Sequence, residues 1–175
     1  GPYSCKQMTI KALNWNGRTT QYISNIELDT YNNLEIDRWP NLKASSRGII
    51  EGSIYQDVEI FKLKIFGINI NVNNIYFGID KLGHFISTGR DYYRTYRRWL
   101  WLTGNKNFAS KKAIRRGIFS ERTYYGLLIS GVFSMADLEA NYQGLLFARN
   151  FCEGSNPYLK LENKKWKLSR KITIK

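Results

Sequence analysis

The sequence has few of the residues that most metal and nucleophilic sites need. Its 175 residues include one histidine, His84, and two cysteines, Cys5 and Cys152, which lie near opposite ends of the chain. Zinc sites need clustered Cys and His ligands, so we expect no metal site and no cofactor. The two cysteines could form a disulfide or remain two buried thiols. No run of about 18 apolar residues is present, so the sequence predicts no membrane-spanning helix.

Several motifs with well-understood chemistry are also missing. The sequence contains no Gly-rich phosphate loop ending in Lys-Ser, no Gly-x-Ser-x-Gly elbow, no His-Glu-x-x-His pair and no nucleic-acid-binding motif. These absences argue against a P-loop nucleotidase, an α/β-hydrolase and a zinc protease. Any activity must therefore come from a site without a standard local signature.

Acidic residues are scarce relative to basic ones, and the imbalance differs between the two parts of the chain. The chain has 27 Lys and Arg against 14 Asp and Glu, a net charge of +13. Residues 1–78 contain 8 basic and 7 acidic side chains, whereas residues 79–175 contain 19 and 7. An excess of one sign attracts partners of the other sign, so we expect an anionic partner at the second part. Nucleic acid, acidic lipid and cell-wall glycan remain open, as does a basic surface that only keeps the protein soluble.

Residues 3–78 are predicted to form strands and loops. The segments 21–28 and 49–63 are rich in β-branched and aromatic residues, and the segment 68–73 alternates strictly between apolar and polar residues. We expect these strands to be antiparallel and to pack on helices. The predicted class is α+β, in a single domain over residues 3–175.

The remaining sequence predicts three consecutive helices and a basic tail. The first covers residues 80–102 and ends at Thr103-Gly104, the second covers 110–129, and the third covers 134–152. Ser134 and Asp137 have the spacing of a capping box. The tail, 153–175, is expected to be extended, with a short strand near 170–174.

Two side chains in the helical part are candidates for proton transfer. His84 is the only side chain with an unperturbed pKa near neutrality, and it is expected either to catalyse or to orient other groups. Glu121 lies in a predicted helix, where Gly117 on the same face is expected to leave room and Tyr124 and Tyr125 to supply stacking surface. A carboxyl group against aromatic rings acquires a raised pKa, which suits a glycosidase acid. The alternative is an ordinary ion pair of Glu121 with a neighbouring arginine.

The third helix has a polar stripe. Asp137 and Asn141 are four residues apart and share a face, with Gly144 one turn further. Asp137 is also the third residue of the capping box, so its role stays open between capping and catalysis. Asn141 has little local use in mid-helix unless it bonds a group outside the helix.

Aromatic and basic residues interleave between positions 90 and 101. Such mixtures bind single-stranded nucleic acid or sugars, and the aromatics also fill cores. For at least some of these aromatic residues we expect core packing. The residues are Arg90, Tyr92, Tyr93, Arg94, Tyr96, Arg97, Arg98, Trp99 and Trp101.

Part of this pattern resembles a family of bacterial envelope proteins. Over about 65 residues, Asp80-Lys-Leu-Gly-His-Phe85, Glu121, the segment 131–137 and Ala140-Asn141 with Gly144 are similar to VanZ-like membrane proteins and related small periplasmic lipoproteins. The membrane spans of VanZ-like proteins are missing here. The resemblance implies an envelope setting and one site formed by the following residues: Asp80, His84, Glu121, Ser134, Asp137 and Asn141.

A second resemblance is to lysozyme-type muramidases and lytic transglycosylases. In those enzymes a helical glutamate is followed by an irregular segment and a helix that lines a glycan cleft. Glu121, residues 126–133 and the helix 137–151 are similar in order. Arg122 replaces the serine usual after the catalytic glutamate, and the expected β-hairpin is shortened to Ser130-Gly131.

These observations favour a peptidoglycan-active glycoside hydrolase. Glu121 is the expected general acid, with Asp137 and His84 in catalysis and Tyr124, Tyr125, Ser134 and Asn141 in substrate binding. We expect a monomer in the periplasm or outside the cell. Gly1-Pro2 is typical of the remnant of a cleaved tag, which fits prior removal of a signal peptide. The alternative is a non-enzymatic envelope protein that binds anionic glycan, membrane surface or, less favoured, nucleic acid.

Overall fold

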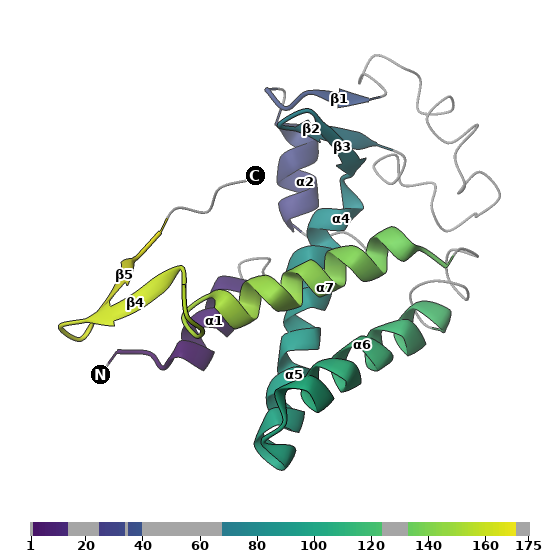
Figure 1. The fold of residues 1–175 in the computed structure, drawn as a ribbon. Helices are drawn as coiled ribbons and strands as arrows, with labels where there is room; N and C mark the ends of the chain where they lie inside the picture. Colours follow the sequence, from purple (N-terminus) through teal and green to yellow (C-terminus); the bar gives the residue numbers. More distant parts are fainter. Residues whose placement is uncertain (1, 14–24, 34, 40–67, 124–132, 171–175) are drawn as a thin grey trace.

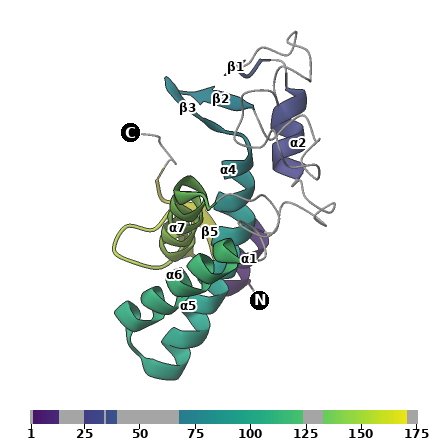
Figure 2. The ribbon, with the colours of Figure 1, turned by 90° about the vertical axis from the view of Figure 1, so that its right-hand side faces the viewer.

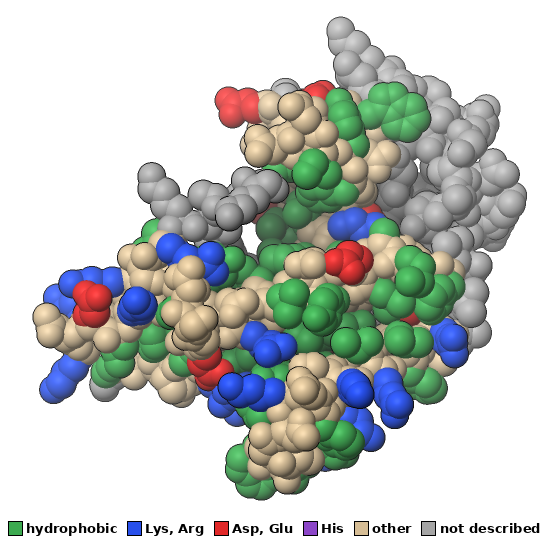
Figure 3. Space-filling view, in the orientation of Figure 1, with side chains coloured by type: hydrophobic (Ala, Val, Ile, Leu, Met, Phe, Trp, Pro, Cys, Tyr) green, Lys and Arg blue, Asp and Glu red, His purple; other side chains and the backbone are tan. Residues whose placement is uncertain are grey.

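The computed structural model describes residues 2–13, 25–33, 35–39, 68–123 and 133–170, and these residues form an α+β fold, as predicted (Figure 1). Helices α5, α6 and α7 pack together at the centre, with α1 beside them (Figures 1 and 2). Small antiparallel sheets lie at two edges of this helical core. Lys and Arg side chains are spread over the helices and the C-terminal hairpin (Figure 3).

The first predicted helix is present as one continuous helical segment. It consists of α4 (Asp80–Gly83), a π-helical turn η2 (His84–Thr88) and α5 (Gly89–Thr103). The segment ends where the sequence predicts, because Gly104 adopts a left-handed conformation (φ 64°) that terminates helices. The π-helical turn is notable because such turns are frequent at functional sites.

The second and third predicted helices are also present in the structure. Helix α6 (Lys106–Arg122) begins four residues before the predicted start, because the Asn105 side chain accepts a hydrogen bond from the Phe108 amide and forms the cap. Helix α7 (Met135–Asn150) begins after Ser134, the predicted cap. Residues 124–129 of the predicted second helix lie outside the described residues.

The three helices pack closely because small residues line their contacts. The core contains three tyrosines of α5, two alanines of α6, and Leu145 and Ala148 of α7. Alanine on α6 lets its backbone approach the tyrosine rings. The expectation that several aromatics of α5 fill the core is therefore confirmed for the following residues: Tyr92, Tyr93 and Tyr96.

Both described hairpins turn through two residues with positive φ, Asn73-Asn74 in the first and Asn163-Lys164 in the second. Strand β2 (Asn69–Val72), predicted from its alternation, pairs with β3 (Ile75–Gly78), and β1 (Arg38–Trp39) pairs with the other edge of β2. The turn residues Asn73 and Asn74 have positive φ of 58° and 65°, as a two-residue type I′ turn requires. In the tail, β4 (Leu159–Glu162) and β5 (Lys165–Leu168) form a second hairpin, which the sequence analysis did not predict. Most of the strand predicted near 170–174 lies outside the described residues.

The N-terminal part contains helices where strands were predicted. The segment 21–28 was expected to be a strand, but α2 (Asn25–Asn32) begins within it, and α1 (Cys5–Leu13) is a further helix. The prediction was wrong because tertiary contacts outweigh β propensity: Glu27 and Tyr31, one helical turn apart, face α4 and the sheet. The predicted strand at 49–63 lies outside the described residues.

A disulfide joins the two ends of the helical core. Cys5 in α1 and Cys152 after α7 are bonded, with their Cα atoms 5.7 Å apart and 147 positions apart in sequence. Thr9 and Leu13 of α1 are buried beside the core. The disulfide and these contacts hold α1 against the end of α7.

Candidate functional site

Glu121 is placed inside the molecule by a stripe of small residues on α6. Ala109, Ala113, Gly117 and Glu121 recur every four residues, and all four are buried. The stripe faces α5 and α7, so its last member carries a carboxyl group into the interior. Glu121 is only 3% exposed.

Helix α7 contributes its polar stripe to the same place. Asp137 and Asn141 are 7% and 2% exposed, on the face that also buries Gly144 and Leu145. Helix α7 can approach the long helical segment closely because Gly144 has no Cβ atom. A Cβ atom at this position would collide with the backbone of Phe85 and Gly89. The two glycines thus bring the polar stripe of α7 against the start of the long helix.

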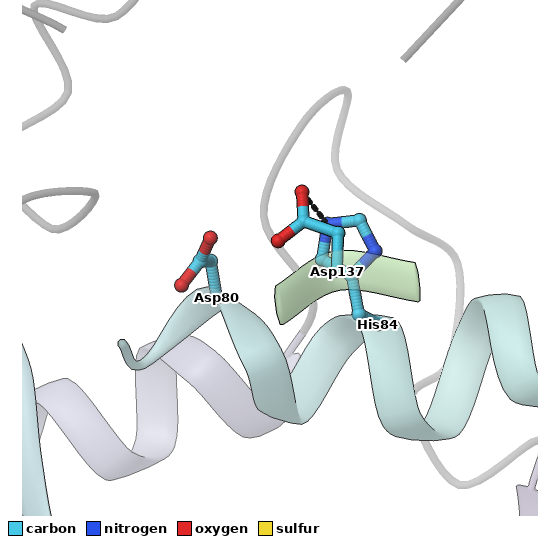
Figure 4. A group of neighbouring side chains, drawn as sticks. All are labelled: Asp80, His84 and Asp137. Carbon is cyan, nitrogen blue, oxygen red and sulfur yellow. Dashed lines mark ion pairs between the residues drawn. The ribbon is translucent and has the colours of Figure 1, made fainter. Parts of the chain in front are cut away.

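The N-terminal turn of that long helix supplies a carboxylate, an ammonium group and an imidazole. Asp80 and His84 lie one turn apart and point toward Asp137 of α7 (Figure 4). Lys81 forms ion pairs with both Asp80 (2.6 Å) and Asp137. His84 Nε2 lies 3.2 Å from Asp137 Oδ2. Asp137 is therefore bonded to two basic side chains at once.

Asn141 and Ser134 complete the hydrogen bonding. His84 Nδ1 lies 3.1 Å from Asn141 Oδ1, so both ring nitrogens face oxygen atoms, an arrangement in which the ring donates twice only as an imidazolium. Ser134 donates through its hydroxyl to Asp137 Oδ1 at 2.8 Å and accepts from the Asp137 amide. Asp137 therefore serves in the helix cap and in the buried network together.

Glu121 and Asp137 have pKa values displaced in opposite directions. Burial and, next, the negative charge of Asp137 together raise the pKa of Glu121 to about 7. The pKa of Asp137 is lowered, because the charges of His84 and Lys81 outweigh the opposing effect of burial. One carboxyl group is thus held partly protonated at neutral pH beside another that is held ionised.

Lys81 stays charged despite its position. Burial by itself lowers the pKa of Lys81, but the carboxylates of Asp80 and Asp137 outweigh that effect and raise it. Its ammonium group thus lies between two carboxylates. A buried charge needs such partners.

The structure brings together most of the candidate site residues that were predicted from the sequence. His84, Glu121, Asp137, Ser134 and Asn141 all belong to one connected network. Among the described residues, Glu121 makes no ion pair with a neighbouring arginine, which was the alternative role for it. The proposed sugar contacts Tyr124 and Tyr125 lie outside the described residues.

One expectation about this site was wrong. Gly117 was expected to leave room beside Glu121 for a ligand, but that space is filled by the hydroxyl group of Tyr92. Glycine occurs at position 117 because any larger residue would collide with the Tyr92 ring. The glycine therefore serves helix packing.

Sequence reasoning overlooked Lys81. A lysine between an aspartate and a leucine in a strongly basic chain looks like an ordinary solvated residue. A usable signal was its position: residues 80, 81 and 84 share one face of a helix. A lysine beside two polar residues that face the interior must find acidic partners there.

The same group has the composition of a cation site. Ligand atoms of Asp80, His84 and Asp137 lie within 4.8 Å of one another. The ammonium group of Lys81, however, is bonded to both carboxylates. Lys81 therefore provides the positive charge between the carboxylates in this arrangement, and an ion could bind only if that side chain moved.

Comparisons with known proteins give no relative for this fold and site. No family model, no curated protein and no solved structure matches the chain. In the part of the chain that the structure describes, no helix combines the length and the apolar character that crossing a bilayer requires. The function must therefore be argued from the residues themselves.

Proposed function

We propose that the protein is an acid–base hydrolase that cleaves glycosidic bonds in peptidoglycan, with Glu121 as the general acid. The observation that carries this proposal is the pair Glu121 and Asp137. Two adjacent carboxyl groups with pKa values displaced in opposite directions are the usual arrangement for acid–base catalysis. A pKa of about 7 lets Glu121 hold a proton and release it at neutral pH.

The reaction would use the two carboxyl groups differently. Glu121 donates its proton to the leaving glycosidic oxygen as the bond to the anomeric carbon breaks. Asp137, kept ionised by Lys81 and His84, stabilises the positive charge that develops on the sugar and accepts a hydrogen bond from the attacking water. The Glu121 carboxylate then takes a proton from that water and regains its initial state.

The contact between the carboxyl groups limits the mechanism. Retaining glycosidases hold their two carboxyl groups about 5 Å apart, and inverting enzymes hold them further apart. Glu121 and Asp137 interact directly, since the charge of Asp137 and a side-chain hydrogen bond with it both raise the pKa of Glu121. Asp137 is therefore proposed to orient water and stabilise charge, and not to form a covalent intermediate.

Two further features support an envelope setting. The Cys5–Cys152 disulfide suits an oxidising compartment such as the periplasm or the cell exterior. The net charge of +13 would draw the protein to an anionic wall. The resemblance to VanZ-like and small periplasmic proteins points the same way.

The test is hydrolysis of purified peptidoglycan, in its N-acetylated and de-N-acetylated forms, followed by release of reducing ends. Loss of a general acid typically costs 10²–10⁴ in rate, so Glu121→Gln should be at least about 100-fold slower. Glu139→Gln is the matched control, because Glu139 is an exposed carboxylate on α7. Full activity in Glu121→Gln, or no activity of the native protein on either substrate, contradicts the proposal.

A second function is favoured by the burial of the network. Glu121, Asp137 and Asn141 are each less than 10% exposed, as expected if they only hold three helices together in a non-enzymatic basic envelope protein. Stability separates the two proposals. Catalytic residues often stabilise a protein when replaced, whereas a structural network loses several kcal/mol. If the network is only structural, Asp137→Asn should unfold at lower urea concentration and the native protein should hydrolyse neither form of peptidoglycan.

A further inference from the structure

An exposed apolar group stands at the corner between α5 and α6. Trp101 is 82% exposed, Leu102 52% and Phe108 39%, and we call these three residues the α5–α6 tip. The chain turns between the two helices at Gly104 and Asn105, so the tip is the convex end of a helical hairpin (Figures 1 and 2). Large apolar side chains gathered at a convex end usually mark an interaction site.

Basic side chains surround this tip. Between residues 89 and 122 the sequence has 10 Lys and Arg and 2 Asp and Glu, so this segment alone supplies a net +8 of the total +13. In Figure 3, Lys and Arg side chains adjoin hydrophobic ones over the lower end of the molecule, where α5 and α6 meet. The exposed basic residues nearest the tip in sequence are Arg94, Arg98, Lys106 and Lys111.

A cavity of about 420 Å³ opens beside the tip. Trp101 lines it together with Lys6 of α1 and three arginines of α5, Arg94, Arg97 and Arg98. Arg97 is held by Glu153 at 2.7 Å. Arg94 and Arg98 form no ion pair with any residue that the structure describes. The cavity therefore offers two guanidinium groups that are not paired with a described carboxylate, and guanidinium groups suit a phosphate group.

The exposed apolar residues of the α5–α6 tip and the arginines of the cavity together favour one kind of anionic partner over the others. A nucleic acid or a wall glycan would satisfy the arginines, but it would leave Leu102 and much of Trp101 in water. A lipid leaflet satisfies both features, because tryptophan and leucine enter the boundary between headgroups and acyl chains while lysine and arginine contact anionic headgroups. We propose that the α5–α6 tip docks on an anionic membrane surface, with a lipid phosphate in the adjacent cavity.

Docking would fix the distance between the membrane and the candidate site. His84 and Trp101 belong to one continuous helical segment and are 17 residues apart. At 1.5 Å per residue this is roughly 25 Å along the helix. A protein anchored by its tip would hold the buried network that far from the headgroups if the helix stood upright. The docking proposal does not depend on the chemistry of that network.

The experiment is co-sedimentation of the full chain with vesicles of phosphatidylglycerol and phosphatidylcholine, compared with vesicles of phosphatidylcholine alone. We expect binding to the anionic vesicles, weakened by salt. The Trp101→Ala/Leu102→Ala variant should bind at least tenfold more weakly. Arg94→Gln and Arg98→Gln should each cost roughly fivefold. Phe119→Ala is the matched control, because Phe119 is a 61% exposed aromatic residue of α6 outside the tip, and its affinity should not change.

Several results would overturn the proposal. These are equal affinity of the native chain for both vesicle types, unchanged affinity of the Trp101→Ala/Leu102→Ala variant, and an equal loss in Phe119→Ala. Binding to single-stranded DNA or to peptidoglycan without binding to anionic vesicles would also reject it. Urea unfolding of each variant checks the fold, and we expect no change because the replaced side chains are exposed.

Discussion

Replacing Glu121 by glutamine should change the pH dependence of stability. Glutamine keeps the size of a protonated glutamate and can still donate a hydrogen bond to Asp137, but it cannot ionise. In the folded protein the pKa of Glu121 is about 7, against an ordinary value of 4.5. The folded state therefore holds this proton more tightly than the unfolded state does.

The sign and size of the effect follow from that difference. Because the folded pKa is the higher one, the stabilising contribution is complete below pH 4.5 and is lost as pH rises through 7. The difference between a pKa of about 7 and the ordinary 4.5 corresponds to about 3 kcal/mol. Between pH 4.5 and 8.5, Glu121→Gln should gain about 3 kcal/mol relative to the native protein. For a chain of this size that equals roughly 6–12 °C in melting temperature.

The assay is urea unfolding followed by circular dichroism at half-unit pH steps from 4.5 to 8.5, without reducing agent. The lowered pKa of Asp137 affects stability in more acidic solution, so it does not interfere in this range. Glu139→Gln, an exposed carboxylate on the same helix as Asp137, should run parallel to the native protein. If the Glu121→Gln curve also runs parallel to the native one, within about 0.5 kcal/mol, the buried environment does not control this carboxyl group.

Two further predictions concern the connections around the site. Lys81→Met should destabilise the protein by about 3–5 kcal/mol in urea unfolding at pH 7, because Asp80 and Asp137 then remain buried without their shared cation. Adding Asp137→Asn should recover part of this loss, and a cost below about 1 kcal/mol for Lys81→Met would show that the ion pairs matter little. The Cys5→Ser/Cys152→Ser variant should lose about 5 kcal/mol, since the native disulfide closes 147 positions of chain. A urea midpoint that is insensitive to dithiothreitol in the native protein would contradict that estimate.

Local signals in the sequence were sufficient for the three helical segments after residue 79 and for one strand. The cap at Ser134, the end at Thr103-Gly104 and the alternation of residues 68–73 depend on neighbours within a few positions, and the structure contains all three features. The helix α2 was missed because the segment 21–28, in which it begins, contains β-branched and aromatic residues that favour a strand, whereas contacts with α4 and the sheet favour the helix.

The sequence by itself determined the class of fold, the distribution of charge and the candidate residues His84, Glu121 and Asp137, because periodicity, capping and composition are local properties. Only the tertiary structure decided how these residues meet. It placed Lys81 between two carboxylates, filled the space at Gly117 with Tyr92, and joined Cys5 to Cys152. Each of these outcomes depends on the packing of helices that lie far apart in the chain. The pKa values of Glu121 and Asp137 depend on the same packing, since burial and neighbouring charge exist only once the helices have come together.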